Sequence, residues 1–383
     1  MNNFAMDKNL TNNSGHRYVM LDGLRGIAAL VVICYHIFEG FATSSVDQMV
    51  NHGYLAVDFF FMLSGFVIGH AYDGRWRDGG ITTCGFFRRR LIRLHPMLIV
   101  GVLLGTLAFA IQGFVQWDGT PVSGHWVWLA TILSFFFIPA YPGAAYEVRG
   151  NGEMFPLNGP AWSLFFEYIG NILYALILRK LPTRALGVVV ILSAIGLTLF
   201  ATCNLSGGYH LGVGWSLGEW NFLGGMLRLG FGFSAGLMMA RLYRPRHIRG
   251  AFWICTGLIV LLLSVPFVGD FEGGTGWING IYDAACVVFI FPLLLYVGAS
   301  GHPKEGTSGR GYDFLGRLSY PLYIVHYPLM YLFYAWVWGE SIAFADAWPV
   351  ALAVIGVSIL VAWLTLKFYD EPLRRRLSKR RSS

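Results

Sequence analysis

Ten hydrophobic stretches, each long enough to cross a lipid bilayer as a helix, recur along this chain of 383 residues. A span needs about 20 apolar residues, and because lipid offers the backbone no hydrogen-bond partners, such segments fold as α-helices. With 55% hydrophobic and only 13% charged residues, the chain has too little polar surface for a water-soluble domain. We therefore predict an all-α polytopic membrane protein, with spans near residues 23–41, 55–72, 94–114, 160–178, 185–203, 222–240, 251–269, 281–299, 318–338 and 347–366.

An eleventh apolar stretch, residues 126–141, is short and is interrupted by Pro139. Basic residues decide its placement, because they concentrate in cytoplasmic loops. If this stretch does not cross, the basic clusters fall on one side and only Arg149 lies in an outer loop. We therefore predict ten spans, both termini in the cytoplasm and a re-entrant or interfacial segment at 126–141. The clusters are Lys8 and Arg17; Arg75, Arg77, Arg88, Arg89, Arg90 and Arg93; Arg179, Lys180 and Arg184; Arg241, Arg244, Arg246 and Arg249; Lys304, Arg310 and Arg317; and Lys367, Arg374, Arg375, Arg376, Lys379, Arg380 and Arg381.

The net charge of +7 comes largely from this cytoplasmic collar, which suits anionic lipid headgroups, so the expected partner is the bilayer and not nucleic acid. The five cysteines lack metal-ligand spacing, and we expect neither a disulfide framework nor a metal site. The polar first 20 residues argue against a cleavable signal peptide. We expect a multi-pass protein of a bacterial inner membrane.

Glycine is frequent, and two pairs have the spacing that brings transmembrane helices close together. These pairs are Gly101 with Gly105 and Gly232 with Gly236. We expect both to mark close helix–helix contacts.

Arg25 and His36 are ionisable residues inside the first apolar stretch. Eleven residues make about three helical turns, so both side chains project from one face, about 16 Å apart along the axis. Ionisable groups at this depth in lipid are costly and by default face a cavity, a partner or a substrate path. Glu39, three residues after His36, shares its face and can orient the imidazole ring.

Later spans also contain polar side chains. Glu167 lies one turn into its span, where an unpaired carboxylate would be expensive, and we predict Arg228 as its counter-ion. A buried structural ion pair is the alternative to a catalytic role. Asp58 opens the second span, and Ser64 lies six residues deeper. We expect Ser64 to pack and not to act as a nucleophile, because the sequence shows no Ser-His-Asp arrangement.

Six motifs occur in one order along the chain and together resemble the acyltransferase-3 family of integral membrane acyltransferases. The motifs are Asp22-Gly23-Leu24-Arg25-Gly26 with His36, residues 57–66 (VDFFFMLSGF), residues 87–96 (FRRRLIRLHP), Trp162-Ser163-Leu164-Phe165-Phe166-Glu167, residues 315–326 (LGRLSYPLYIVH) and Tyr369-Asp370-Glu371-Pro372-Leu373. The resemblance covers residues 17–376 and implies one membrane domain over residues 1–383, with no fused extracellular esterase domain. His95 departs from the family, in which an aromatic residue commonly precedes this proline.

The resemblance implies transfer of an acyl group, expected to be acetyl, from cytoplasmic acyl-CoA to a hydroxyl of a sugar-containing acceptor. Cell-surface polysaccharides and lipid-linked glycans are acceptors of this class. The family's essential arginine matches Arg25, and its Arg-x-x-Arg element matches Arg90 and Arg93. Fixed cations at the membrane surface suit the phosphates of coenzyme A, so we assign donor binding to these three arginines. Topology determinants, or an Arg25 that snorkels beside Asp22, are the structural alternatives.

His36 is the expected general base, because imidazole exchanges a proton near neutral pH. A histidine nucleophile that forms an acyl-imidazole is a second option, and a structural interior histidine is the third. Glu167 is a candidate ligand of the acceptor hydroxyl or a partner of His36. The other residues expected to line the substrate cavity are Glu39, Asp58, Ser64, Trp162, Ser163, Arg228, Ser319, Tyr323 and His326.

A transporter or flippase is the alternative function, with Glu167, Arg228 and His36 forming a binding or proton-relay site. The sequence shows no inverted repeat, which argues against it. A non-catalytic scaffold comes third, because so many intramembrane ionisable groups would be costly without a use.

Overall fold

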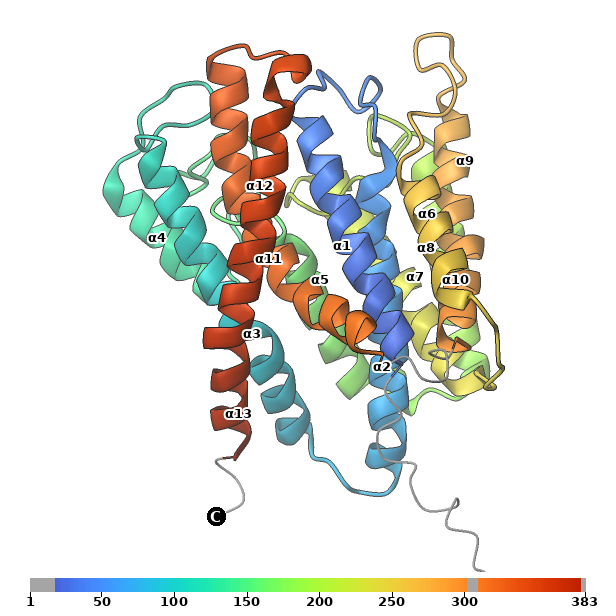
Figure 1. Ribbon diagram of the computed structural model, residues 1–383. Helices are drawn as coiled ribbons and strands as arrows, with labels where there is room; N and C mark the ends of the chain where they lie inside the picture. Colours follow the sequence, from blue (N-terminus) through green and yellow to red (C-terminus); the bar gives the residue numbers. More distant parts are fainter. Residues whose placement is uncertain (1–17, 302–308, 380–383) are drawn as a thin grey trace, which may run out of the picture.

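The computed structural model describes residues 18–301 and 309–379, and every regular element in these ranges is a helix (Figure 1). Five predicted members of the basic collar, Lys8, Arg17, Lys304, Arg380 and Arg381, lie outside the described residues. The elements are α1 (Val19–Glu39), η1 (His52–Leu55), α2 (Ala56–Arg77), α3 (Thr83–Ile111), α4 (Gly124–Phe135), α5 (Ala161–Leu176), η2 (Leu178–Lys180), α6 (Thr183–Thr202), α7 (Glu219–Leu242), α8 (Ala251–Leu263), α9 (Trp277–Ala285), η3 (Cys286–Ile290), α10 (Phe291–Ala299), α11 (Arg310–Gly339), α12 (Phe344–Thr365), η4 (Leu366–Asp370) and α13 (Glu371–Lys379).

Eight helical stretches of the described chain are long and apolar enough to cross a membrane. They are Val19–Glu39, His52–Arg77, Thr83–Ile111, Ala161–Lys180, Thr183–Thr202, Glu219–Leu242, Trp277–Ala299 and Phe344–Ser378. The sequence predicted ten, and the difference lies at α8 and α11. Helix α8 has only 13 residues and covers about 20 Å, less than the hydrocarbon thickness of about 30 Å.

Helix α11 has 30 residues but is not among the eight stretches. Its sequence contains Pro321, Pro328, His326 and several tyrosines, which lower its hydropathy. The structure explains how it accommodates them, because α11 packs against α1, α3 and α12 and buries half of its residues. Protein surrounds these polar groups in place of lipid.

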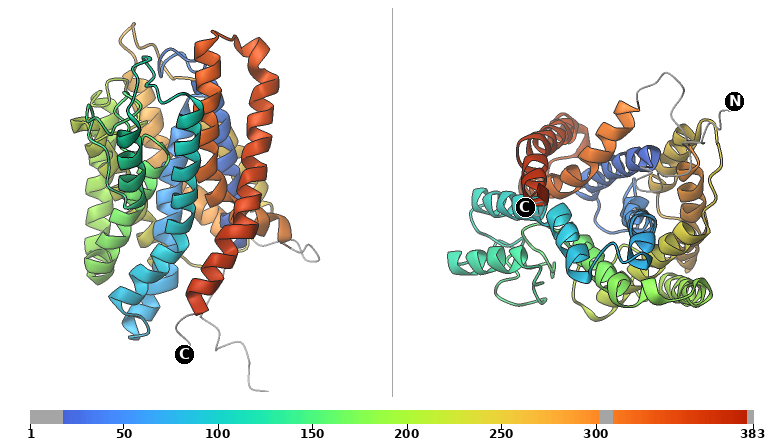
Figure 2. Two further views of the ribbon diagram at one scale, coloured as in Figure 1. Left: turned by 90° about the vertical axis from the view of Figure 1, so that its left-hand side faces the viewer. Right: turned by 90° about the horizontal axis from the view of Figure 1, so that it is seen from below.

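Helix α4, which overlaps the segment predicted to be re-entrant or interfacial, has 12 residues and covers about 18 Å. It packs beside α3 and is too short to span the hydrocarbon core. The start of α1, the connection between α2 and α3, and α13 lie at one end of the bundle (Figures 1 and 2). Many of the described basic residues belong to these segments, so we call this end the basic end. Viewed along the bundle, α1 and α2 lie near its centre (Figure 2).

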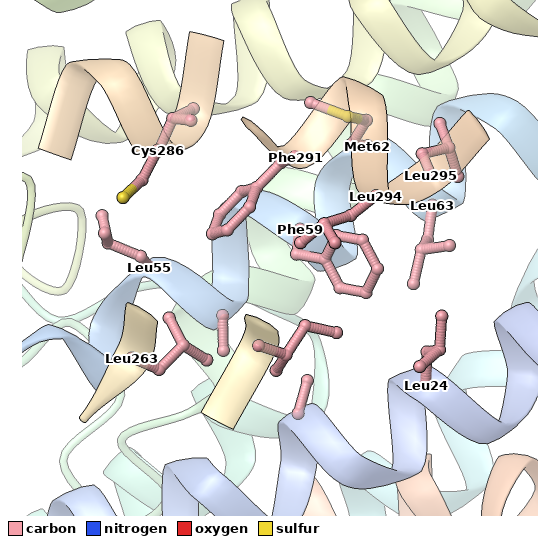
Figure 3. Close-up of a cluster of buried hydrophobic side chains, with 14 of the residues drawn as sticks. Leu24, Leu55, Phe59, Met62, Leu63, Leu263, Cys286, Phe291, Leu294 and Leu295 are labelled. Atoms are coloured by element: carbon pink, nitrogen blue, oxygen red, sulfur yellow. The ribbon is translucent and has the colours of Figure 1, made fainter. Parts of the chain in front are cut away.

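The interior beside α1 and α2 is apolar, as Figure 3 shows. Leu24 of α1, Phe59 and Met62 of α2, Leu263 of α8 and Phe291 of α10 belong to one buried cluster. This cluster fixes α1, which carries the candidate catalytic histidine, against three neighbouring helices.

The two glycine pairs lie against different parts of the chain. In α7, a Cβ atom at Gly236 would meet the backbone of Met62 and Phe66, so this pair marks the predicted close contact of α2 with α7. A Cβ atom at Gly105 of α3 would instead meet the backbone of Leu157, which lies in the loop before α5. The predicted helix–helix contact is therefore present at Gly101, where a Cβ atom would meet Ile324 of α11, whereas at Gly105 the loop takes the space that the missing side chain leaves.

Candidate active site

His36 lies one turn before the end of α1 on a cavity of about 440 Å³. Its Nδ1 lies 2.7 Å from Oε2 of Glu39, the partner that the i, i+3 spacing predicted. The Tyr334 hydroxyl donates to the same carboxylate oxygen, at 2.9 Å. Because a carboxylate accepts the proton of Nδ1, the neutral ring carries its lone pair on Nε2. No residue of the described chain forms a hydrogen bond to Nε2, which leaves that nitrogen available to accept a proton from a substrate.

This space, which we call the outer cavity, contains a second carboxylate, that of Glu153. The Tyr331 hydroxyl donates to Oε2 of Glu153 at 2.5 Å, and the Asn151 amide donates to Oε1 at 2.9 Å. Burial raises the pKa of Glu153, and the negative charge of Glu39 adds to the effect. The two carboxylates are therefore close enough to influence each other.

Arg149 holds the loop that carries Glu153. Its guanidinium lies 3.4 Å from the centre of the Tyr331 ring, and it donates to Pro156 O and to Gln112 Oε1, both at 2.8 Å. The side chain is almost completely buried, and burial lowers the pKa of the guanidinium. Arg149, the one basic residue predicted in an outer loop, is thus a structural anchor.

A smaller cavity of about 90 Å³, which we call the inner cavity, lies deeper in the bundle. Arg25 of α1 reaches its wall and donates from Nε to Ser319 Oγ at 2.8 Å and from Nη2 to Gly316 O at 2.9 Å. Its Nη2 is 3.8 Å from Asp22 Oδ1. Arg25 therefore links α1 to α11 and does not simply extend toward the membrane surface.

Glu167 pairs with Arg90, and not with Arg228 as the sequence predicted. Arg90 Nη2 lies 2.5 Å from Glu167 Oε1, and Ser64 Oγ donates to the same oxygen at 2.9 Å. All three residues line the inner cavity. The hydroxyl of Ser64 thus donates to the Glu167 carboxylate. Nor does Glu167 partner His36, whose ring is held by Glu39.

Arg228 pairs with Asp58 instead, at 2.7 Å between Nη2 and Oδ2, and both side chains are fully buried. It also donates to Val213 O at 2.6 Å and to Tyr54 O at 2.7 Å. Its guanidinium lies 5.2 Å from the Trp162 ring, which lines the outer cavity. The prediction that Asp58 lines the cavity is wrong, because the helix contact between α2 and α7 encloses its carboxylate.

Tyr323 borders both cavities. Its hydroxyl donates to Ser163 Oγ at 2.9 Å, because the Ser163 hydroxyl gives its own proton to Pro160 O. His326 was expected on the cavity as well, but it is fully buried behind its wall, with Nδ1 against Leu322 O and the ring 5.5 Å from that of His36. Although His326 lies one helical turn from Tyr323, its ring packs beside that of His36 and borders neither cavity.

Arg93 connects the inner cavity to a third space. It borders both the inner cavity and a groove of about 710 Å³ at the basic end of the bundle, where α3 meets α13. Arg88, Arg89 and Arg374 also line this groove, which we call the basic groove. Groove, inner cavity and outer cavity thus follow one another through the bundle, with shared walls at Arg93 and Tyr323.

A family model described as an acyltransferase domain matches residues 18–367. The chain belongs to the acyltransferase-3 family. It is 28% identical over 398 residues to acyltransferase MdmB of Streptomyces mycarofaciens, covering 95% of this chain and 94% of that protein. It is 24% identical over 386 residues to the O-acetyltransferase OatA of Staphylococcus aureus, covering 93% of this chain but 57% of OatA. A protein of the picA locus of Rhizobium radiobacter is 35% identical over 167 residues, 42% of this chain and 81% of its own. No solved structure matches.

The comparisons confirm the family resemblance and with it a multi-pass membrane acyltransferase. Part of the site was nevertheless not predicted from the sequence. Tyr327, Tyr331 and Tyr334 line the outer cavity together with the predicted Tyr323, and their spacing of four, four and three places all four on one helical face, a signal that was present. Glu153 gave no such signal, since it lies in an irregular segment.

Proposed function

We propose that this protein is a membrane O-acyltransferase that moves an acyl group, expected to be acetyl, from acyl-CoA at the basic end to a sugar hydroxyl in the outer cavity. The observation that carries the proposal is the series of three spaces that ends at His36, with shared walls at Arg93 and Tyr323. By the positive-inside rule, the basic end faces the cytoplasm. If α8 and α11 are counted with the eight apolar stretches, the chain crosses ten times and both ends are cytoplasmic.

The donor's phosphates suit the basic groove, where Arg88, Arg89, Arg93 and Arg374 supply fixed positive charge. From there the pantetheine arm would enter past Arg93 and pass along the inner cavity. Arg90 neutralises Glu167 in that cavity, so the carboxylate does not repel the donor. We retain Arg90 and Arg25 as donor-site residues that shape this passage.

His36 Nε2 would take the proton of the acceptor hydroxyl while its oxygen attacks the thioester carbonyl. When the carbon–sulfur bond breaks, the imidazolium returns the proton to the thiolate, and the products are an ester and free coenzyme A. Glu39 stabilises the imidazolium and holds the ring. The Tyr323 hydroxyl donates to Ser163 Oγ, so it could donate to the oxyanion of the tetrahedral intermediate only by leaving that partner. An acyl-histidine intermediate would use the same Nε2 atom.

The relatives support this proposal in kind, since OatA is named an O-acetyltransferase and MdmB an acyltransferase. The transporter alternative needed Glu167, Arg228 and His36 in one relay. The three residues instead form separate pairs, with Arg90, Asp58 and Glu39 respectively.

The test uses purified protein in nanodiscs, radiolabelled acetyl-CoA and a panel of glycans. Labelled acceptor or labelled protein that disappears in His36→Ala supports the proposal. Folded His36→Ala protein that transfers acetyl at the full rate contradicts it, and substrate flux without acylation supports the transporter.

A further inference from the structure

We infer that the acceptor unit bound beside His36 is a sugar ring without an anionic group, neutral or amino-substituted, and that Glu153 helps to select it. This inference rests on the proposed function and names the substrate class of its outer cavity. The walls, the charges and the position of Glu153 each contribute to it.

The walls of the outer cavity are largely aromatic. Trp117, Trp162, Trp215 and Trp338 line it together with the tyrosines of α11. Aromatic rings offer apolar faces for the C–H faces of a sugar, while tyrosine hydroxyls and indole N–H groups supply polar contacts at the edges. A volume of about 440 Å³ accommodates a ligand of one to two sugar rings.

The charges on these walls disfavour an anion. Glu39 and Glu153 contribute two carboxylates, and Arg228 is the one lysine or arginine among the described lining residues. Its charge is already matched by Asp58. His210 also lines the cavity, but burial lowers its pKa to about 4, so it is neutral at physiological pH. A uronic acid or a phosphorylated sugar would therefore meet carboxylates without a free cation to balance its own charge.

Glu153 is placed to accept hydrogen bonds from such a ring. Each of its oxygens has one protein donor, Tyr331 or Asn151, whereas a carboxylate can accept about four hydrogen bonds. Glu153 lines the same cavity as His36, so its remaining acceptor positions are open to a sugar bound there. A sugar hydroxyl or ammonium group next to the acylated position can fill them.

Arg149, a buried cation outside the lining, offsets part of the charge of Glu153, because its guanidinium opposes the rise in the pKa of that carboxyl. Its guanidinium lies behind the Tyr331 ring, and its hydrogen bonds go to Pro156 and Gln112. An anionic acceptor would reach it only by displacing Tyr331, which donates to Glu153.

The test starts from sealed membranes of cells that produce the protein, supplied with radiolabelled acetyl-CoA. The labelled glycan is digested, and mass spectrometry identifies the sugar unit that carries the ester. With that acceptor, KM and kcat are compared for the wild type, Glu153→Gln and Asp118→Asn. Asp118 is the matched control, because it is an exposed carboxylate in the same outer segment and does not line the cavity.

We expect the ester on a neutral or amino sugar. We expect Glu153→Gln to raise the acceptor KM about tenfold and to leave the acetyl-CoA KM unchanged, with Asp118→Asn like the wild type. An ester on a uronic acid or phosphorylated unit overturns the inference, as does an unchanged acceptor KM in folded Glu153→Gln. Complete absence of transfer by folded wild-type protein is a different result, because it overturns the proposed function itself.

Discussion

Gly236→Ala tests the contact between α2 and α7 that positions the Asp58–Arg228 pair. A Cβ atom at Gly236 would lie 2.8 Å from Phe66 N and 2.9 Å from Met62 C, with the Met62 carbonyl oxygen closer still. Ordinary contact begins at 3.4 Å, so the two helices must separate by at least 0.6 Å. Because backbone lies on the far side, no side chain can rotate away.

Overpacking of this kind costs about 3 kcal/mol, and the better helix propensity of alanine offsets about 1 kcal/mol of it. The net loss of about 2 kcal/mol should lower the unfolding midpoint by about 2 to 3 °C for a chain of this length. Intrinsic tryptophan fluorescence of the detergent-solubilised protein during heating measures this midpoint. Gly356→Ala is the control, since a Cβ atom there meets nothing within 4 Å, and we expect an unchanged or higher midpoint. Equal midpoints for Gly236→Ala and the wild type would refute the contact.

Three further predictions concern charge. Arg93→Ala should raise the KM for acetyl-CoA about tenfold, because it removes the cation shared by the basic groove and the inner cavity. Arg184→Ala, at an exposed position, is the control and should leave this KM unchanged. Equal effects of the two changes in steady-state kinetics would contradict donor binding at Arg93. Asp58→Asn leaves Arg228 buried without its carboxylate and should lower the free energy of unfolding by about 3 kcal/mol. The double variant Asp58→Leu with Arg228→Met should lose less, because it leaves no unpaired charge. Thermal unfolding of the two variants compares the losses directly. Burial raises the pKa of Glu147 from 4.5 to about 7. As the pH rises between these two values, Glu147 loses its proton in the unfolded chain before it does so in the folded one, and the free energy of unfolding falls. Glu147→Gln should remove this decline, and midpoints at pH 5 and pH 8 that shift equally in both proteins would contradict it.

The sequence predicted best what depends on local spacing. The first span, expected at residues 23–41, is α1 at Val19–Glu39, and the i, i+3 spacing of His36 and Glu39 predicted the observed 2.7 Å contact. The period that places Tyr327, Tyr331 and Tyr334 on the same face of α11 as the predicted Tyr323 was equally readable, although it was overlooked.

Long-range pairing was the part that the sequence could not give. Glu167 and Arg90 are 77 residues apart, on α5 and α3. A carboxylate in a span indicates that a cation must pair with it, but the sequence does not indicate which cation. The choice of Arg228 was wrong because α2 supplies Asp58 across its contact with α7. Hydropathy also treated α8 and α11 as ordinary spans, although α8 is short and protein shields much of α11.

The central claim is that the acyl group passes from the basic end of the bundle to His36. Sealed, inside-out vesicles test it directly, with radiolabelled acetyl-CoA added to the exposed cytoplasmic face and the acceptor glycan enclosed in the lumen. We predict labelled ester on the enclosed glycan with the wild type and none with folded His36→Ala. Transfer that occurs only when donor and acceptor share one side, or that persists in His36→Ala, would contradict the account.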